Sequence, residues 1–326
     1  MASIRIDSTS NIPGYRIEAA GYSAFICAKM GANCIQLQKG GASFLRTPGD
    51  WEQFKRDPNL YGMPILFPPN RINHGEFQFN GTRYVFPINE ISRGHHIHGF
   101  LSATPFLLCD TRTDANQASI TFTYEATPEL PYRCFPHTFK ILLIYLLDED
   151  GLHQSVEVTN TGDRPMPFFL GFHTAFNQRF LPHTEKEDYR LKIAVQNEIM
   201  LDRQTIIPTG EFIERNKLVQ DLNDGNVCPG ERVLSNHFVA NKGGNKEAVY
   251  LHMPTGRKIH YTTCGCYNYW MVFNRGIDSG FICIEPQTCI VDAANSPLPP
   301  RITGFRALEK GEIVKLQTHL QEITET

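Results

Sequence analysis

The sequence predicts an all-β fold, a large β-sandwich or barrel with few short helices. Turn signals recur at short spacing, and the strongest is the Asn80-Gly81 pair between two short aromatic-rich runs. Residues 118–124 alternate strictly between apolar and polar side chains, as expected of a strand with one wet face. Helical periodicity is weak along the whole chain. Many strands with few helices indicate a β-sandwich or a barrel.

The predicted elements follow in chain order. A strand pair spans 36–44 around the Lys39-Gly40-Gly41 turn, and a hairpin follows around Asn80-Gly81. The clearest hairpin joins an apolar arm to an alternating arm through Asp148-Glu149-Asp150-Gly151. The expected strands are 36–44, 75–79, 82–86, 118–124, 139–147, 152–158, 166–170, 248–253, 258–263, 269–273, 282–285 and 312–320. The best helix candidates are 50–56 and part of 179–189.

Composition narrows the class of protein. The 326 residues show no low-complexity linker, so residues 1–326 are expected to form a single domain. With 31 basic and 34 acidic residues spread along the chain, a nucleic-acid partner is not expected. Nine cysteines in a long chain fit buried thiols in a reducing compartment. The N-terminus lacks an apolar signal core, and no apolar run could span a membrane, so we expect a cytoplasmic protein. The oligomeric state stays open, a homodimer included.

His173 is the most informative single residue. It follows the apolar stretch 166–170, among small residues and aromatics. A histidine held by strands can exchange protons near neutral pH. Its partner could be a carboxylate or a metal, and a purely structural role is the third alternative.

Two further segments carry chemically suitable side chains. Arg71, after Asn70 in a proline-bounded loop, offers a planar fork of donors for an oxygen-rich ligand, or else a surface salt bridge. Glu285 ends an apolar stretch that should be buried, and Pro286 is expected to end that strand. A buried carboxylate is costly unless it is hydrogen-bonded or has a task. The alternative for Glu285 is a structural ion pair.

The run Gly94 to Phe100 contains three histidines. On a strand, His96 and His98 would share one face and could offer two metal ligands. No third ligand is placed convincingly nearby. The alternatives are a neutral histidine that hydrogen-bonds a polar ligand, and exposed histidines in a loop.

Taken in order, these segments resemble the aldose 1-epimerase family, the galactose mutarotases. The matching motifs are Asn70-Arg71, the hairpin with Gly75, Phe77, Gly81 and Tyr84, Asn89-Glu90, His98-Gly99, His173 with Phe176-Asn177, and Glu285-Pro286-Gln287-Thr288. The resemblance covers about residues 60–300. It implies a large antiparallel β-supersandwich and the interconversion of sugar anomers without metal or cofactor.

The resemblance also implies site roles. Glu285 would be the general base at the anomeric hydroxyl, and His173 the general acid at the ring oxygen. His98, Arg71 and Asn70 would bind the sugar. Partial burial is expected to raise the pKa of Glu285, and a carboxylate neighbour or a hydrogen bond to keep His173 protonated.

One family feature is missing. Aligned with the family, Cys264 or a neighbour, after Thr255-Gly256-Arg257, stands where an aspartate usually binds sugar hydroxyls. Three alternatives therefore remain beside the mutarotase. They are a non-catalytic sugar-binding protein on the same fold, a metal-dependent enzyme that uses His96 and His98, and a sugar-phosphate mutarotase. The last would need a second basic residue near Arg71, for which Arg83 and Arg93 are the nearby candidates.

Overall fold

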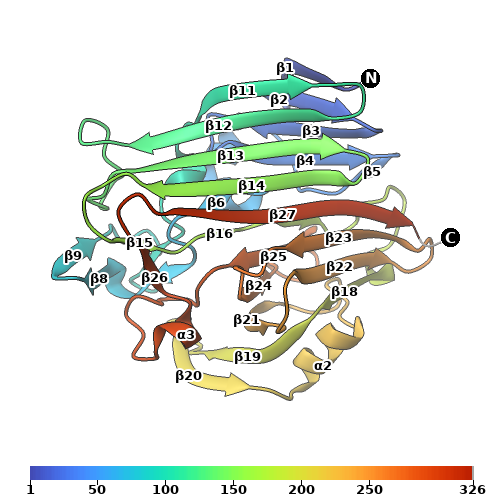
Figure 1. Ribbon diagram of the computed structural model, residues 1–326. Coiled ribbons are helices and arrows are strands. Elements are labelled where there is room, and N and C mark those ends of the chain that lie inside the picture. Colours follow the sequence, from blue (N-terminus) through green and yellow to red (C-terminus); the bar gives the residue numbers. More distant parts are fainter. Residues whose placement is uncertain (325–326) are drawn as a thin grey trace.

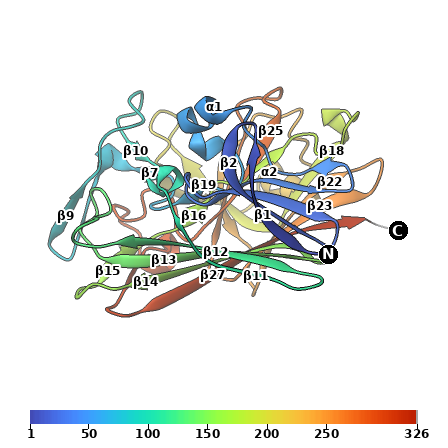
Figure 2. The same cartoon turned by 90° about the horizontal axis from the view of Figure 1, so that it is seen from above.

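The computed structural model describes residues 1–324 and consists mainly of antiparallel strands in two facing layers (Figures 1 and 2). One layer is an eight-stranded sheet. Its order is β11 (Leu107–Thr113), β12 (Ala118–Ala126), β13 (Phe139–Asp148), β14 (Gly151–Asn160), β27 (Ile313–Thr324), β23 (Arg257–Thr263), β22 (Lys246–His252) and β18 (Tyr189–Ile193). The predicted all-β sandwich is confirmed.

The other layer combines two sheets. The first runs in sequence order through β1 (Ser3–Thr9), β2 (Ile12–Ala19), β3 (Tyr22–Cys27), β4 (Asn33–Lys39) and β5 (Ala42–Ser43). The second has the order β20 (Pro208–Ile213), β19 (Val195–Leu201), β21 (Ser235–Ala240), β24 (Tyr269–Phe273), β25 (Phe281–Gln287), β16 (Gly171–Phe172) and β6 (Ile65–Leu66), with β17 (Ala175–Asn177) paired to β25.

Short elements complete the fold. Three strand pairs are β7 (Arg71–Ile72) with β10 (His96–Ile97), β8 (Glu76–Phe79) with β9 (Thr82–Val85), and β15 (Met166–Phe168) with β26 (Arg306–Leu308). The α-helices are α1 (Trp51–Arg56), α2 (Lys217–Asp224) and α3 (Pro300–Thr303); the 3-10 turns are η1 (Pro58–Leu60), η2 (Asn73–Gly75), η3 (Leu101–Ala103) and η4 (Lys186–Asp188). In residues 1–324 no helix is long and apolar enough to cross a membrane.

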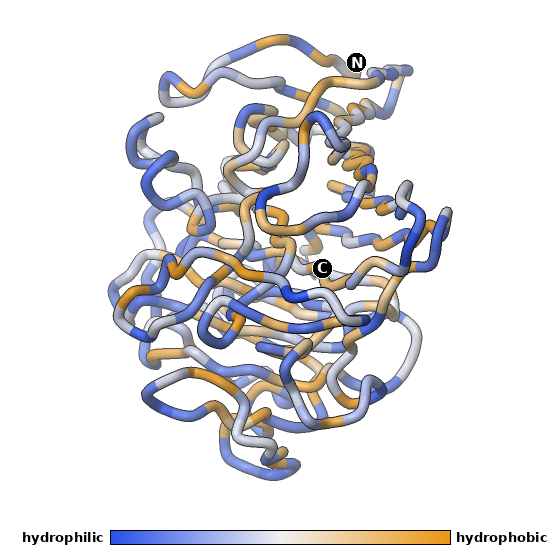
Figure 3. The backbone as a smooth tube through the Cα atoms, turned by 90° about the vertical axis from the view of Figure 1, so that its left-hand side faces the viewer, coloured by the Kyte–Doolittle hydropathy of each residue, from blue (hydrophilic) through white to orange (hydrophobic). Residues whose placement is uncertain are grey.

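The core lies between the layers. Along β13 every second side chain, from Phe139 to Leu147, is buried, and the intervening ones are partly exposed. Figure 3 shows the same mixture of hydrophobic and hydrophilic positions along the strands. Period-two alternation turns one face of the sheet inward, so the apolar pattern sets the register of the β13–β14 hairpin.

Most predicted strands are confirmed, one predicted helix is present only as a 3-10 turn, and one predicted strand end is wrong. Asn80-Gly81 connects β8 to β9, and Asp50 caps α1 by accepting from the Gln53 amide. Within 179–189, however, the helical structure is limited to the 3-10 turn η4. Pro286 also does not end its strand, because β25 continues to Gln287. Register places Pro286 opposite Phe172 of β16, so its missing N–H leaves one bond out of that ladder. The strand continues because the Ile284 and Thr288 amides on either side still donate across it, to the Thr174 and Leu170 carbonyls.

Candidate active site

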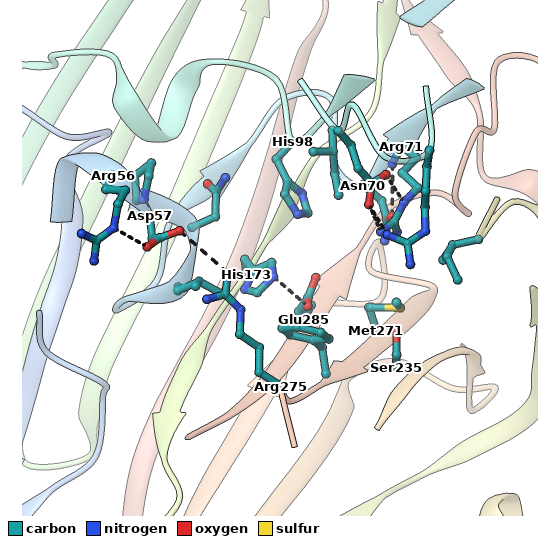
Figure 4. Close-up of a pocket in the computed structure, with 18 residues that line it drawn as sticks. Arg56, Asp57, Asn70, Arg71, His98, His173, Ser235, Met271, Arg275 and Glu285 are labelled. Atoms are coloured by element: carbon teal, nitrogen blue, oxygen red, sulfur yellow. Dashed lines mark hydrogen bonds and ion pairs between the residues drawn. The ribbon is translucent and has the colours of Figure 1, made fainter. Parts of the chain in front are cut away.

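All five residues singled out in the sequence line one cavity of about 450 Å³ (Figure 4). They reach it from different parts of the second layer and its flanking loops. The lining residues are Arg56, Asp57, Pro58, Asn59, Leu60, Asn70, Arg71, Glu90, Arg93, Ile97, His98, His173, Ile206, Ser235, Met271, Phe273, Arg275 and Glu285. The cavity is therefore built by segments that are far apart in the chain.

Strand register brings His173 opposite Glu285. Gly171 of β16 pairs with Gln287, and Ala175 of β17 pairs with Cys283. Counting inward from both pairs places His173, in the two-residue break between β16 and β17, opposite Glu285 on β25. The His173 amide instead donates to the Pro64 carbonyl at 3.1 Å, which holds this segment in the sheet. Opposed residues of antiparallel strands project from the same face, so both side chains enter the cavity.

The two side chains form a buried pair. His173 Nε2 lies 3.2 Å from Glu285 Oε1, and the side chains are 6% and 2% exposed. Gln287 donates to the second oxygen of Glu285 at 3.2 Å. The His98 ring lies edge-on to the His173 ring, with 5.2 Å between the ring centres. The histidine and the carboxylate that the sequence proposed as partners are thus in direct contact.

Burial controls the protonation of this pair. It raises the pKa of Glu285 to about 8, against opposing effects from Gln287 and the charge of Arg71. It lowers the pKa of His173 to about 4, and the positive charge of Arg275 acts in the same direction. The cause is the loss of water around both charged forms. The expectation of a protonated His173 is therefore wrong, because at neutral pH these shifts leave the imidazole neutral and the proton of the pair on Glu285.

Glu285→Gln is expected to stabilise the protein above neutral pH. In the unfolded chain this carboxyl ionises near its ordinary pKa of 4.5, whereas the folded protein holds its proton to about pH 8. The wild type therefore loses stability as the pH rises through this window, and the amide does not. We expect a gain of about 2–4 kcal/mol at pH 8 and little gain at pH 4.5, measured by urea unfolding.

The matched control for this measurement is Glu129→Gln, which changes an exposed carboxylate in a loop. Its effect on unfolding free energy should stay within about 0.5 kcal/mol at both pH values. A Glu285→Gln difference that is the same at pH 4.5 and pH 8 would show that burial does not hold the proton on Glu285.

Arg71 is held rigidly at the opposite wall. Its Nε and Nη2 donate to the two carboxylate oxygens of Glu90 at 2.7 and 2.8 Å, and its Nη1 donates to Asn70 Oδ1 at 3.1 Å. A guanidinium has five N–H groups, so one remains on each terminal nitrogen for a ligand. The sequence resemblance included Glu90 in a motif, but its function as the anchor of Arg71 emerges only from the structure.

His98 reaches the cavity through a local backbone arrangement. Ile97 pairs with Arg71 across β10 and β7, and the His98 amide donates to the Asn70 carbonyl at 2.9 Å. Both Asn70 and His98 have positive φ, 55° and 70°, which ends the strand pair and redirects the two side chains. His98 Nδ1 is buried and has no hydrogen-bond partner in the described part of the chain.

The structure contradicts a metal site built from His96 and His98. His96 packs against Phe86 and Phe100, and its Nδ1 lies 2.8 Å from the Pro87 carbonyl oxygen. Because φ turns positive at His98, the two rings do not share a strand face.

Within residues 1–324, one group of three candidate ligands lies within 4.8 Å of one another, and it consists of His173, Cys283 and Glu285. Burial raises the pKa of the Cys283 thiol well above its ordinary value, so Cys283 is a protonated, poor ligand. That the site works without metal or cofactor stays a prediction.

Cys264 lies elsewhere on the molecule. It follows β23 and borders a separate surface depression together with Thr262 and Gln317. The idea that Cys264 replaces a sugar-binding aspartate in this cavity is therefore wrong, because that strand belongs to the other sheet. Ser235 of β21 and Met271 of β24 line the cavity, and Cys264 does not.

Several cavity residues were not identified from the sequence. Arg56 ends α1, Asp57 follows it, and Arg275 follows β24, in segments without a recognisable motif. Of the two basic residues considered near Arg71, Arg93 lines the cavity, whereas Arg83 pairs with Glu76 in the β8–β9 hairpin. A charged residue in a loop gives no signal of the cavity that it faces.

Comparison with known proteins agrees with the fold. The family model described as aldose 1-epimerase matches residues 13–321. The protein YphB of Escherichia coli K12 is 25% identical over 261 residues, 78% of this chain and 81% of YphB.

Two solved structures share the fold. A galactose mutarotase-like protein from Clostridium acetobutylicum aligns over 99% of both chains, with 29% identity and a TM-score of 0.94. Galactose 1-epimerase from Lactobacillus acidophilus has 16% identity and a TM-score of 0.73, over 100% of this chain and 99% of its own. With the family model matched over nearly its whole length, this chain belongs to the aldose 1-epimerase family.

Proposed function

We propose that the protein interconverts the α and β anomers of an aldose by acid–base opening and closing of the sugar ring. The observation that carries this proposal is the buried contact between His173 and Glu285 in the cavity. The reaction removes a proton from O1 and adds one to O5. Both oxygens are bonded to C1, so one acid and one base that touch each other can reach both.

The proton balance of the pair suits this reaction. The single shared proton moves from Glu285 to His173 when the sugar binds, which leaves a carboxylate as base and an imidazolium as acid. Glu285 then takes the O1 proton while His173 protonates O5, and the C1–O5 bond breaks. Rotation about C1–C2 and the reverse transfers close the other anomer. The charge of Arg71, which acts to lower the pKa of Glu285, favours the reactive distribution.

The binding residues support the charge changes of the reaction. Arg71 has one N–H free on each terminal nitrogen, and His98 has an unpartnered Nδ1. Preorganised donors are effective where negative charge gathers on oxygen in the open-chain transition state. Asn70 and Glu90 keep the guanidinium in place without a rearrangement during the reaction.

The direct test is a screen of anomer exchange. Freshly dissolved α-anomers of glucose, galactose and other aldoses are followed by polarimetry or by NMR exchange spectroscopy, with and without protein. At least one aldose should equilibrate faster than its spontaneous rate in the same buffer. Binding of aldoses without any acceleration would select the alternative, a non-catalytic carbohydrate-binding protein.

Glu90→Gln is expected to lower kcat/KM for anomer exchange by about tenfold or more. The amide offers Arg71 one acceptor oxygen where the carboxylate offers two charged ones, and the loss of a hydrogen bond to a charged group costs about 1.5–3 kcal/mol. Glu90 does not need to touch the sugar for this effect, because it positions Arg71.

A readout beyond activity separates positioning from general damage. Without the charge of Glu90, Arg71 acts more strongly on Glu285, so the alkaline limb of the pH–rate profile should move to lower pH. Glu76→Gln removes the partner of Arg83 outside the cavity and should change neither quantity. An unshifted alkaline limb in Glu90→Gln would contradict the positioning role.

A further inference from the structure

The cavity carries more positive charge than a neutral sugar needs. Four guanidinium groups line it, those of Arg56, Arg71, Arg93 and Arg275, against the carboxylates of Asp57 and Glu90. The Glu285–His173 pair with its single proton is neutral in total. Four positive charges against two negative charges leave an excess of two. Hydroxyl groups of an aldose can be bound by neutral donors and acceptors, so this excess calls for another explanation.

Figure 4 shows Arg71 on one side of the catalytic pair and Arg56 and Arg275 on the other. On one side Arg71 is tied to Glu90 and Asn70, and Arg93 donates to Glu90 at 3.0 Å. On the other side Arg56 and Arg275 share the single carboxylate of Asp57.

The second group has many free donors. Arg275 approaches Asp57 at 3.8 Å and makes no hydrogen bond to any residue in 1–324, so its five N–H groups are open to a ligand. Arg56 uses only Nε, at 3.2 Å from Asp57 Oδ2. The Arg275 side chain is 58% exposed and the Arg56 side chain 70% exposed, so a ligand in the cavity can reach both. Because these two guanidinium groups share one carboxylate, half of their positive charge has no negative partner.

We propose that the substrate is an aldose with an anionic group on C6, a phosphate or a carboxylate, which Arg275 and Arg56 bind. This inference rests on the proposed function and names its substrate class. A guanidinium fork matches the oxygens of both groups and binds them with two parallel hydrogen bonds.

The position of the anion follows from the roles of the catalytic pair. His173 protonates O5, and O5 is bonded to C5, which carries C6. The C6 substituent therefore lies on the His173 side of the sugar. Arg275 is on that side as well, since Figure 4 shows its side chain next to His173, whereas Arg71 lies on the other side of Glu285. An anion beside Arg275 also offsets the charge that opposes protonation of His173, so the correct substrate favours the reactive proton distribution.

The first experiment measures binding without catalysis. 1,5-Anhydroglucitol lacks O1 and cannot open its ring, and calorimetry compares it with its 6-phosphate. The 6-phosphate should bind at least about tenfold more tightly, and Arg275→Gln should remove most of this advantage. Equal affinities of the two analogues for the wild type would overturn the inference.

The second experiment compares exchange rates on glucose, glucose 6-phosphate and glucuronate. We expect kcat/KM to be higher for the anionic sugars, and the ratio of anionic to neutral kcat/KM to fall at least about tenfold in Arg275→Gln and to fall also in Arg56→Gln. A preference for one anionic sugar identifies phosphate or carboxylate as the group. Arg112→Gln is the matched control, since it removes the same charge from an exposed strand outside the cavity.

The outcomes separate the two proposals. If glucose exchanges as fast as both anionic sugars and the ratio is unchanged in Arg275→Gln, the anionic substrate class is wrong and the aldose 1-epimerase activity stands. If no aldose exchanges faster than in buffer, the activity itself is wrong. The analogue comparison then still decides whether this cavity prefers an anionic sugar.

Discussion

Glu285→Gln and His173→Asn are each expected to lower kcat for anomer exchange by about 10²–10⁴-fold. Each change removes one of the two positioned proton transfers and keeps a side chain of similar size. The double variant should be about as slow as the slower single variant, because the two groups share one proton and act as a unit. Polarimetry with the best aldose from the screen measures all three.

The control for these variants is His137→Asn. His137 is also buried, and burial likewise lowers its pKa to about 4, but it bonds the Tyr84 hydroxyl outside the cavity. It should keep kcat within a few fold while it loses stability. Since Glu285→Gln is expected to be stable, a loss of its activity cannot be assigned to unfolding. Retention of wild-type rates in both Glu285→Gln and His173→Asn would remove the proposed acid–base pair.

A bell-shaped pH–rate profile with limbs near pH 4 and pH 8 is the second expected result. Below the pKa of His173 both groups carry protons, so no base remains. Above the pKa of Glu285 the pair has lost its shared proton, so no acid remains. The reactive state with one proton therefore dominates between the limbs, and kcat/KM reports these values for the free enzyme.

The groups around the pair predict how the limbs respond to substitution. Arg71, Arg275 and His98 face it from three different segments, and the Cys283 thiol lies beside it. Arg275→Gln should move the acidic limb to higher pH, because it removes a positive charge that acts on His173. A rate that stays constant from pH 4 to pH 8 and then rises above pH 9 would contradict a shared proton as the reactive form.

Much of the fold could be predicted from local signals. Alternation over 118–124 and the apolar arm of β13 predict strands with one buried face, and Asn80-Gly81 predicts a hairpin. The strands β1 to β3 and β18 to β21 were not predicted, although β18 alternates, and neither was α2. The strand was expected to end at Pro286, but one missing N–H does not end a strand whose neighbouring amides, those of Ile284 and Thr288, keep their bonds.

The candidate site divides in the same way. His173, Glu285, Asn70, Arg71 and His98 stand in short motifs that resemble a known family, so their sequence positions identify them. Arg56, Asp57 and Arg275 belong to no motif and became visible only when the chain placed them around the cavity. Cys264 is the opposite case. Its aligned position suggested a site residue, but the structure places it at a different depression, away from the cavity.

The sequence alone therefore determined the class of fold, the family resemblance and the five residues nominated for the chemistry. These depend on alternation, turn residues and motifs, which are local properties of the chain. The tertiary structure decided which of these side chains touch, which pKa values burial shifts, and which arginines share a carboxylate. Those properties depend on distances and on the exclusion of water between segments such as β16 and β25, and no local pattern contains them.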